Sequence, residues 1–66
     1  MIIKINGKEE TVGTPSSLIE LILDKWLVPD NIVIEHNFRI ISKDEWHGVL
    51  VMENDNVEIV SFVGGG

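Results

Sequence analysis

Short runs of apolar residues separated by polar turns predict a chain of strands around one helix. Residues 1–6 hold three isoleucines and predict a first strand. The dipeptide Asn6-Gly7 is typical of a type I′ turn, because both residues tolerate positive φ. Residues 8–12 are more polar and are expected to return as an edge strand. The start of the chain therefore predicts a β-hairpin.

A helix is predicted after this hairpin. Ser17 and Glu20 have the spacing of a capping box, in which each side chain satisfies a backbone N–H at the helix start. Apolar residues then recur every four positions on one face; they are Leu18, Ile22 and Trp26. We expect this tryptophan to be a core anchor, and we expect Pro29 to end the helix.

The second half of the chain predicts three more strands. Residues 31–36 and 39–41 have the composition of two short strands, and a single helical turn after them is expected to place Trp46 in the core. Residues 49–52 fit either a loop or a short strand. The strongest strand signal in the chain lies at residues 57–63.

This order of elements predicts an α+β fold of the β-grasp, or ubiquitin-like, type. We expect a mixed four- to five-stranded sheet with one main helix packed across it, and the first and last strands as parallel central neighbours. Residues 1–63 are assigned to this domain, and residues 64–66 to a flexible glycine tail.

Alternation places apolar residues on both faces of the last strand. One set is expected to enter the core, and the other set, which points away, predicts an apolar docking patch. The predicted patch comprises Val60 and Phe62 together with Ile32 or Ile34 of the neighbouring strand. The alternative is a second small core beneath the loop of residues 47–53.

Composition and length narrow the classes of function. A chain of 66 residues forms one domain and is too short to enclose a deep substrate pocket, which argues against an enzyme. The net charge of −6 argues against nucleic-acid binding. The chain has no cysteine, and His36 and His47 lack the spacing of a metal site. Apolar runs too short to span a membrane, and a start without signal-peptide features, predict a cytoplasmic protein that is monomeric when free.

The chemistry points to Gly64, Gly65 and Gly66 at the end of the sequence. A glycine tail can enter a channel where larger side chains would clash. Its terminal carboxylate is a poor electrophile, so another enzyme must activate it, most simply as an acyl-adenylate. The sequence therefore predicts a protein whose terminal carboxylate, on Gly66, is activated by another enzyme, with Gly64 and Gly65 as the segment that enters the channel.

At this point the chain resembles the ThiS family, the sulfur carriers of thiamine biosynthesis. The closing run from Asn54 to Gly66 is similar to the end of that family. The opening strand and turn of the family match Ile3–Gly7, and its helix start matches Ser17–Ile22. Its middle matches Ile32–Asn37, followed by Ile40-Ile41 and Asp44-Glu45-Trp46. Asn54 stands where the family often has glycine, and Phe38 occupies a turn where small or polar residues are commoner.

The resemblance implies a protein that binds no cofactor and contributes no catalytic side chain. A ThiF-type enzyme would use ATP to adenylate Gly66, and sulfur from a cysteine desulfurase would convert it to a thiocarboxylate. Thiazole synthase, ThiG, would then receive that sulfur. The alternatives are a carrier for molybdopterin or another sulfur product, a ubiquitin-like modifier joined to lysines through Gly66, and a β-grasp interaction module with an incidental glycine end. Molybdopterin carriers tend to be longer and to have prolines before the tail, which residues 60–63 lack.

Overall fold

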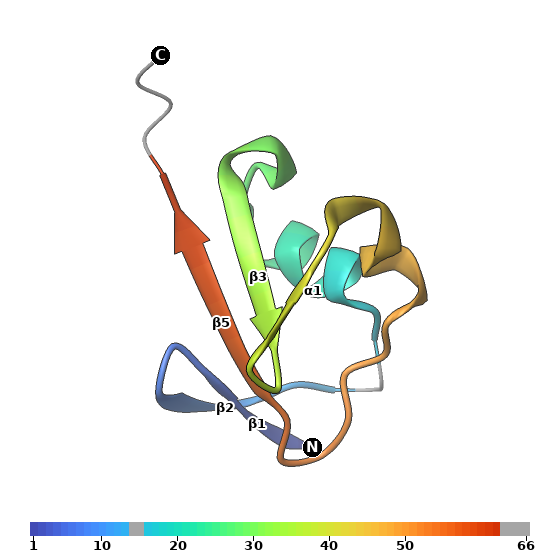
Figure 1. The fold of residues 1–66 in the computed structure, drawn as a ribbon. Coiled ribbons are helices and arrows are strands. Elements are labelled where there is room, and N and C mark those ends of the chain that lie inside the picture. The colour runs from blue at the N-terminus through green and yellow to red at the C-terminus, as the bar shows by residue number, and fades with distance from the viewer. Residues whose placement is uncertain (14–15, 63–66) are drawn as a thin grey trace.

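The protein folds around one five-stranded sheet. A computed structural model describes residues 1–13 and 16–62, and its strands lie in the order β2-β1-β5-β3-β4 (Figure 1). The strands are β1 (Ile2–Ile5), β2 (Lys8–Thr11), β3 (Ile32–His36), β4 (Arg39–Ile41) and β5 (Asn56–Ser61). The predicted α+β, β-grasp arrangement is confirmed.

The first and last strands are the parallel neighbours that the sequence predicts. Lys4 lies beside Asn56 in this pairing, while β2 runs antiparallel to β1 at the edge of the sheet. The turn between β1 and β2 has positive φ at both Asn6 (52°) and Gly7 (83°), which confirms the predicted turn. The other neighbour of β5 is β3, which pairs with it in antiparallel fashion.

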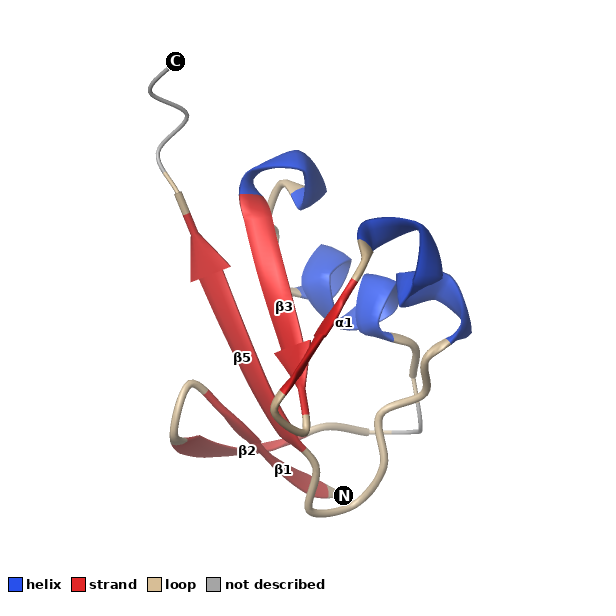
Figure 2. Cartoon of the chain, viewed as in Figure 1, coloured by secondary structure: helices blue, strands red, loops and turns tan. Residues whose placement is uncertain are grey.

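Three helical segments cover one face of the sheet (Figure 2). They are the α-helix α1 (Leu18–Asp24) and two 3₁₀ helices, η1 (Pro29–Asn31) and η2 (Lys43–Gly48). Ser17 caps α1 in the predicted capping box, in which the Ser17 hydroxyl accepts from the Glu20 N–H and the Glu20 carboxylate accepts from the Ser17 N–H. Within residues 1–13 and 16–62, no helix has the length and apolar character needed to cross a membrane.

A single apolar core lies between the helices and the sheet. Its buried members are Ile3, Ile5, Leu18, Leu21, Ile22, Ile32, Ile34, Trp46, Val51, Val57 and Ile59. Trp46 is 1% exposed, as predicted, and its indole N–H donates to the Ile41 carbonyl at 2.9 Å. Residues 49–52 form a loop with one isolated bridge, from Leu50 to Ser17. Val51 of this loop enters the main core, so the loop does not cover a second core.

The end of α1 differs from the prediction. The helix stops at Asp24 rather than near Pro29, and Trp26 is 93% exposed rather than a core anchor. The Trp26 N–H donates to the Leu23 carbonyl, and the Leu27 N–H donates to the Ile22 carbonyl. These two bonds form a Schellman motif, which turns the chain away from the helix axis. The four-residue periodicity therefore continues in the sequence beyond the point where the helix ends.

Candidate functional site

The site begins with β5, because this strand leads directly to the glycine residues. On one side β5 pairs with β3 from the Val57–His36 pair to the Ser61–Ile32 pair. The Phe62 N–H continues this pairing by donating to the Asn31 carbonyl at 2.9 Å. The chain is thus held in the sheet as far as Phe62, and β5 acts as a rigid arm for the residues that follow.

The other side of β5 is held by the side chain of Asn6. Its Oδ1 accepts from the Ile59 N–H at 2.7 Å, and its Nδ2 donates to the Ile59 carbonyl at 3.1 Å. The Asn6 amide therefore takes the place of a neighbouring strand beyond the end of β1. We call this pair of hydrogen bonds the Asn6 clamp.

A polar network fixes the start of β5. Asp55 accepts hydrogen bonds from the His36 ring at 2.7 Å, from the Met52 N–H at 2.8 Å and from the Asn37 amide at 3.2 Å. Burial raises the pKa of Asp55, but the hydrogen bonds from His36, Met52 and Asn37 outweigh it and hold this pKa below 3.8. Asn37 also accepts from the Asn56 N–H. The network joins the β3–β4 turn to the beginning of the arm.

The three predicted tail residues, Gly64, Gly65 and Gly66, lie outside the described residues, as does Val63. Their roles as channel-entering segment and activated carboxylate stay predictions. The structure describes the chain as far as Phe62, four positions before Gly66. The candidate site therefore consists of the arm, the surface around its end and the tail that follows.

Exposed apolar residues lie at the end of the arm and on β3 beside it. Val33 lies directly opposite Val60 in the β3–β5 pairing, and Val33, Val60 and Phe62 are 36%, 55% and 51% exposed. We call these three residues the β5 patch. The outward orientation predicted for Val60 and Phe62 is confirmed, whereas their docking role stays a prediction.

The predicted contribution of Ile32 or Ile34 to this patch is wrong. Both residues are core members, at 7% and 0% exposure, because they share the face of β3 that packs on the helices. Ile34 lies opposite the core residue Ile59, so the residue of β3 that faces outward beside Val60 is Val33. Each strand alternates between inward-facing and outward-facing residues, but only the register between β3 and β5 shows which residue of β3 lies beside Val60.

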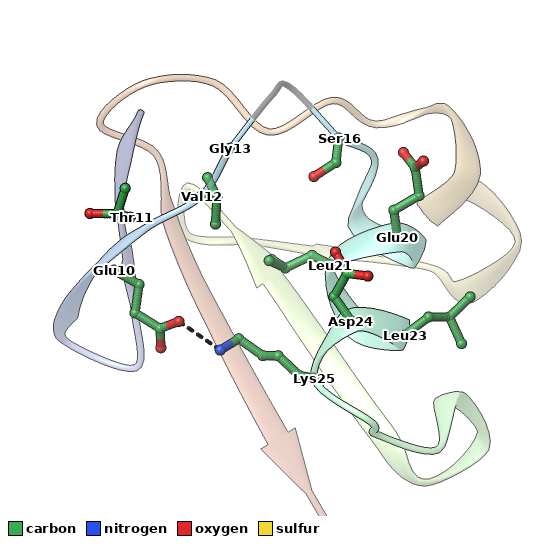
Figure 3. A pocket seen from close by; sticks show the side chains of 10 residues that line it. All are labelled: Glu10, Thr11, Val12, Gly13, Ser16, Glu20, Leu21, Leu23, Asp24 and Lys25. Atoms are coloured by element: carbon green, nitrogen blue, oxygen red, sulfur yellow. Dashed lines mark hydrogen bonds and ion pairs between the residues drawn. The ribbon is translucent and has the colours of Figure 1, made fainter.

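A groove between β2 and α1 is polar and lies away from the arm. Glu10 and Lys25 form an ion pair across it at 2.7 Å (Figure 3). Glu20 and Asp24 also line the groove, and no described residue of β5 does. Within the described ranges no three His, Asp or Glu side chains gather as metal ligands, and His36 is engaged with Asp55 while His47 is exposed.

Two residues near the site were missed by sequence reasoning. The sequence predicts only a turn role for Asn6, and no local pattern indicates that its amide reaches Ile59, 53 positions away. The core position predicted for Trp26 rests on its spacing from Ile22, which fits a helix. Pro29 predicts a helix end only near residue 28, so no signal in the sequence indicates the end at Asp24.

Comparison with known proteins gives a consistent result over the whole chain. Residues 3–66 match the model of the ThiS family. The sulfur carrier protein ThiS of Bacillus subtilis is 36% identical, and the match covers 98% of this chain and all of that protein. The crystal structure of the thiamine biosynthesis protein ThiS from Geobacter metallireducens superimposes with a TM-score of 0.86 at 26% identity, and both chains are covered completely.

A larger relative contains a region of the same kind. A thiazole synthase of Magnetococcus marinus is 29% identical over 66 residues, and this chain spans 20% of its length. The family match nevertheless takes in the arm, the described part of the sheet and the closing glycines. This chain belongs to the ThiS family.

Proposed function

We propose that this protein carries sulfur on the carboxylate of Gly66 for thiazole formation in thiamine biosynthesis. The observation that carries the proposal is the family match, which extends from residue 3 to Gly66, together with a sulfur carrier of 36% identity and equal extent. The fold supports it because the arm is held on the β3 side up to Phe62 and on the β1 side up to Ile59, so the body of the protein holds the chain to within four positions of Gly66.

The chemistry requires activation by a partner. A carboxylate oxygen of Gly66 attacks the α-phosphorus of ATP, and pyrophosphate leaves to give an acyl-adenylate. The terminal sulfur of a protein persulfide then attacks the acyl carbon and displaces AMP. A thiol then attacks the cysteine sulfur of the protein that carried the persulfide and breaks the S–S bond. The thiol and that cysteine form a disulfide, and the terminal sulfur stays on Gly66 as a thiocarboxylate. A ThiF-type enzyme and a cysteine desulfurase would supply the first two steps.

The protein's own residues contribute position rather than catalysis in this proposal. The Asn6 clamp fixes β5 at Ile59 and the Asp55 network fixes its start, while the β5 patch supplies apolar surface near the end of the arm. The recipient of the sulfur is thiazole synthase. This choice is supported by the thiazole synthase of Magnetococcus marinus, which carries a region similar to this chain.

Intact-protein mass spectrometry tests the proposal. The protein is incubated with ATP, a ThiF-type enzyme, a cysteine desulfurase, cysteine and a thiol reductant. We expect a gain of about 16 Da, since sulfur replaces one oxygen. A variant that lacks Gly66 keeps the folded body and serves as the control, and it should gain nothing. Conversion of the shortened variant would refute the terminal mechanism, and conjugation of the wild-type protein to lysines would favour the modifier alternative.

A further inference from the structure

Trp26 combines two features that a folded protein seldom combines in one bulky residue. Its side chain is 93% exposed, and its backbone has a φ of 61°. It occupies the position of the Schellman motif that glycine usually fills, because a side chain disfavours left-handed backbone. Because the indole is exposed, its burial contributes almost nothing to offset the cost of this backbone conformation. Backbone strain of this kind is often found at functional sites. Phe38 shares both features, so the position of Trp26 in the fold must decide whether it has a role.

The surroundings of Trp26 connect it with the end of the arm. Trp26, Val28 and Phe62 line one shallow groove, together with Leu27, Asn31, Ile32 and Ser61. Val28 and Phe62 are 57% and 51% exposed. Phe62 therefore belongs both to the β5 patch and to this second apolar surface, which we call the Trp26 groove and define by Trp26, Val28 and Phe62.

The short distance along the chain from Phe62 to Gly66 means that an enzyme acting on Gly66 must come close to this groove. Gly66 lies four positions beyond Phe62, and an extended chain spans at most about 3.6 Å per residue. The enzyme that acts on the Gly66 carboxylate must therefore bring its catalytic atoms within about 14 Å of Phe62. Glycines offer that enzyme no side chains, so its affinity must come from surface near Phe62. The Trp26 groove lies on that surface.

We propose that the Trp26 groove anchors this protein on the enzyme that adenylates Gly66, with the indole inserted into an apolar pocket of that enzyme. The inference rests on the proposed function and adds a second contact surface to the β5 patch. The net charge of −6 favours a basic rim around that pocket. Exposed tryptophans at the centre of protein interfaces are among the residues that contribute most to binding.

The test measures ATP–pyrophosphate exchange catalysed by the ThiF-type enzyme of the same genome, as a function of carrier concentration. Trp26→Gly removes the indole and gives the left-handed position its preferred residue. The variant should therefore unfold at the same temperature as the wild type or higher. We expect its KM as a carrier to rise at least about tenfold, with kcat and the KM for ATP unchanged.

Phe38→Gly is the matched control. Phe38 is also an aromatic residue with positive φ (70°) and high exposure (78%), but it lies in the β3–β4 turn, near the start of β5. Its replacement should leave the carrier KM unchanged. An equal rise for both variants, or a wild-type KM for Trp26→Gly, would overturn the anchor while exchange by the wild type still supports the proposed function. A wild-type protein that supports no exchange would instead overturn the proposed function itself.

Discussion

Replacing Asn6 with glycine tests whether the Asn6 clamp holds the arm in place. The change removes both side-chain hydrogen bonds to Ile59, while glycine still accepts the φ of 52° that the turn requires. Each bond contributes about 0.5–1.5 kcal/mol, so the variant should lose about 1–3 kcal/mol of unfolding free energy. A domain of 66 residues has on the order of 3–10 kcal/mol in total, so this loss is large.

Thermal unfolding followed by circular dichroism measures the loss. At about 4–8 °C per kcal/mol for a domain of this size, a loss near the middle of the range lowers the Tm by roughly 8–16 °C. Amide hydrogen exchange gives the local measurement, because the Ile59 N–H donates to Asn6 Oδ1. This amide should exchange much faster in the variant.

Asn54→Gly is the control for the clamp. Asn54 also has positive φ (69°), but it lies in the turn before β5 and is exposed. Its replacement should change the free energy of unfolding by no more than about 0.5 kcal/mol. If Asn6→Gly has the Tm of Asn54→Gly and the Ile59 amide stays protected, the clamp does not hold the arm and the reasoning is refuted.

Three further predictions concern the polar network, the patch and the core. The pKa of Asp55 in the folded protein lies below 3.8, so its stabilising effect is present above that pH and is lost as the pH falls through the folded pKa. Asp55→Asn should therefore be less stable than the wild type at pH 7. Urea titrations at several pH values should show this difference in stability shrinking below pH 3.8. Val60→Lys should keep a wild-type Tm within a few degrees, since Val60 is 55% exposed, but raise the carrier KM in pyrophosphate exchange about tenfold; an unchanged KM would count against the β5 patch. Trp46→Ala should lose about 3–5 kcal/mol, since it empties a site that is 1% exposed, and a cooperative unfolding transition near the wild-type Tm would contradict that assignment.

Local signals in the sequence predicted most of the fold. The Asn6-Gly7 turn and the Ser17–Glu20 capping box each depend on residues close together in the chain, and both are present. The order of elements then constrained the topology, because one helix can cross from the first hairpin to the rest of the sheet in few ways. The parallel pairing of β1 and β5 follows from that order.

The errors near the candidate site have two causes, a strand register between distant residues and a local helix end. Ile32, Val33 and Ile34 are all β-branched, so composition does not show which of them face outward. Only the register with β5 assigns Val33 to the patch and its two neighbours to the core. The exposed position of Trp26 has a different cause, because it follows from local hydrogen bonds that end the helix two residues earlier. Local pattern does not predict such choices when a bulky residue takes a glycine position.

We propose that sulfur is carried on Gly66, and its location can be measured directly. The sulfur-loaded protein is fragmented in the mass spectrometer, and the fragments that contain the end of the chain are compared with those of the unloaded protein. We expect that the added mass of about 16 Da, roughly the mass of sulfur minus that of oxygen, stays with the smallest fragment that contains Gly66. The same mass on a fragment without Gly66 would contradict it.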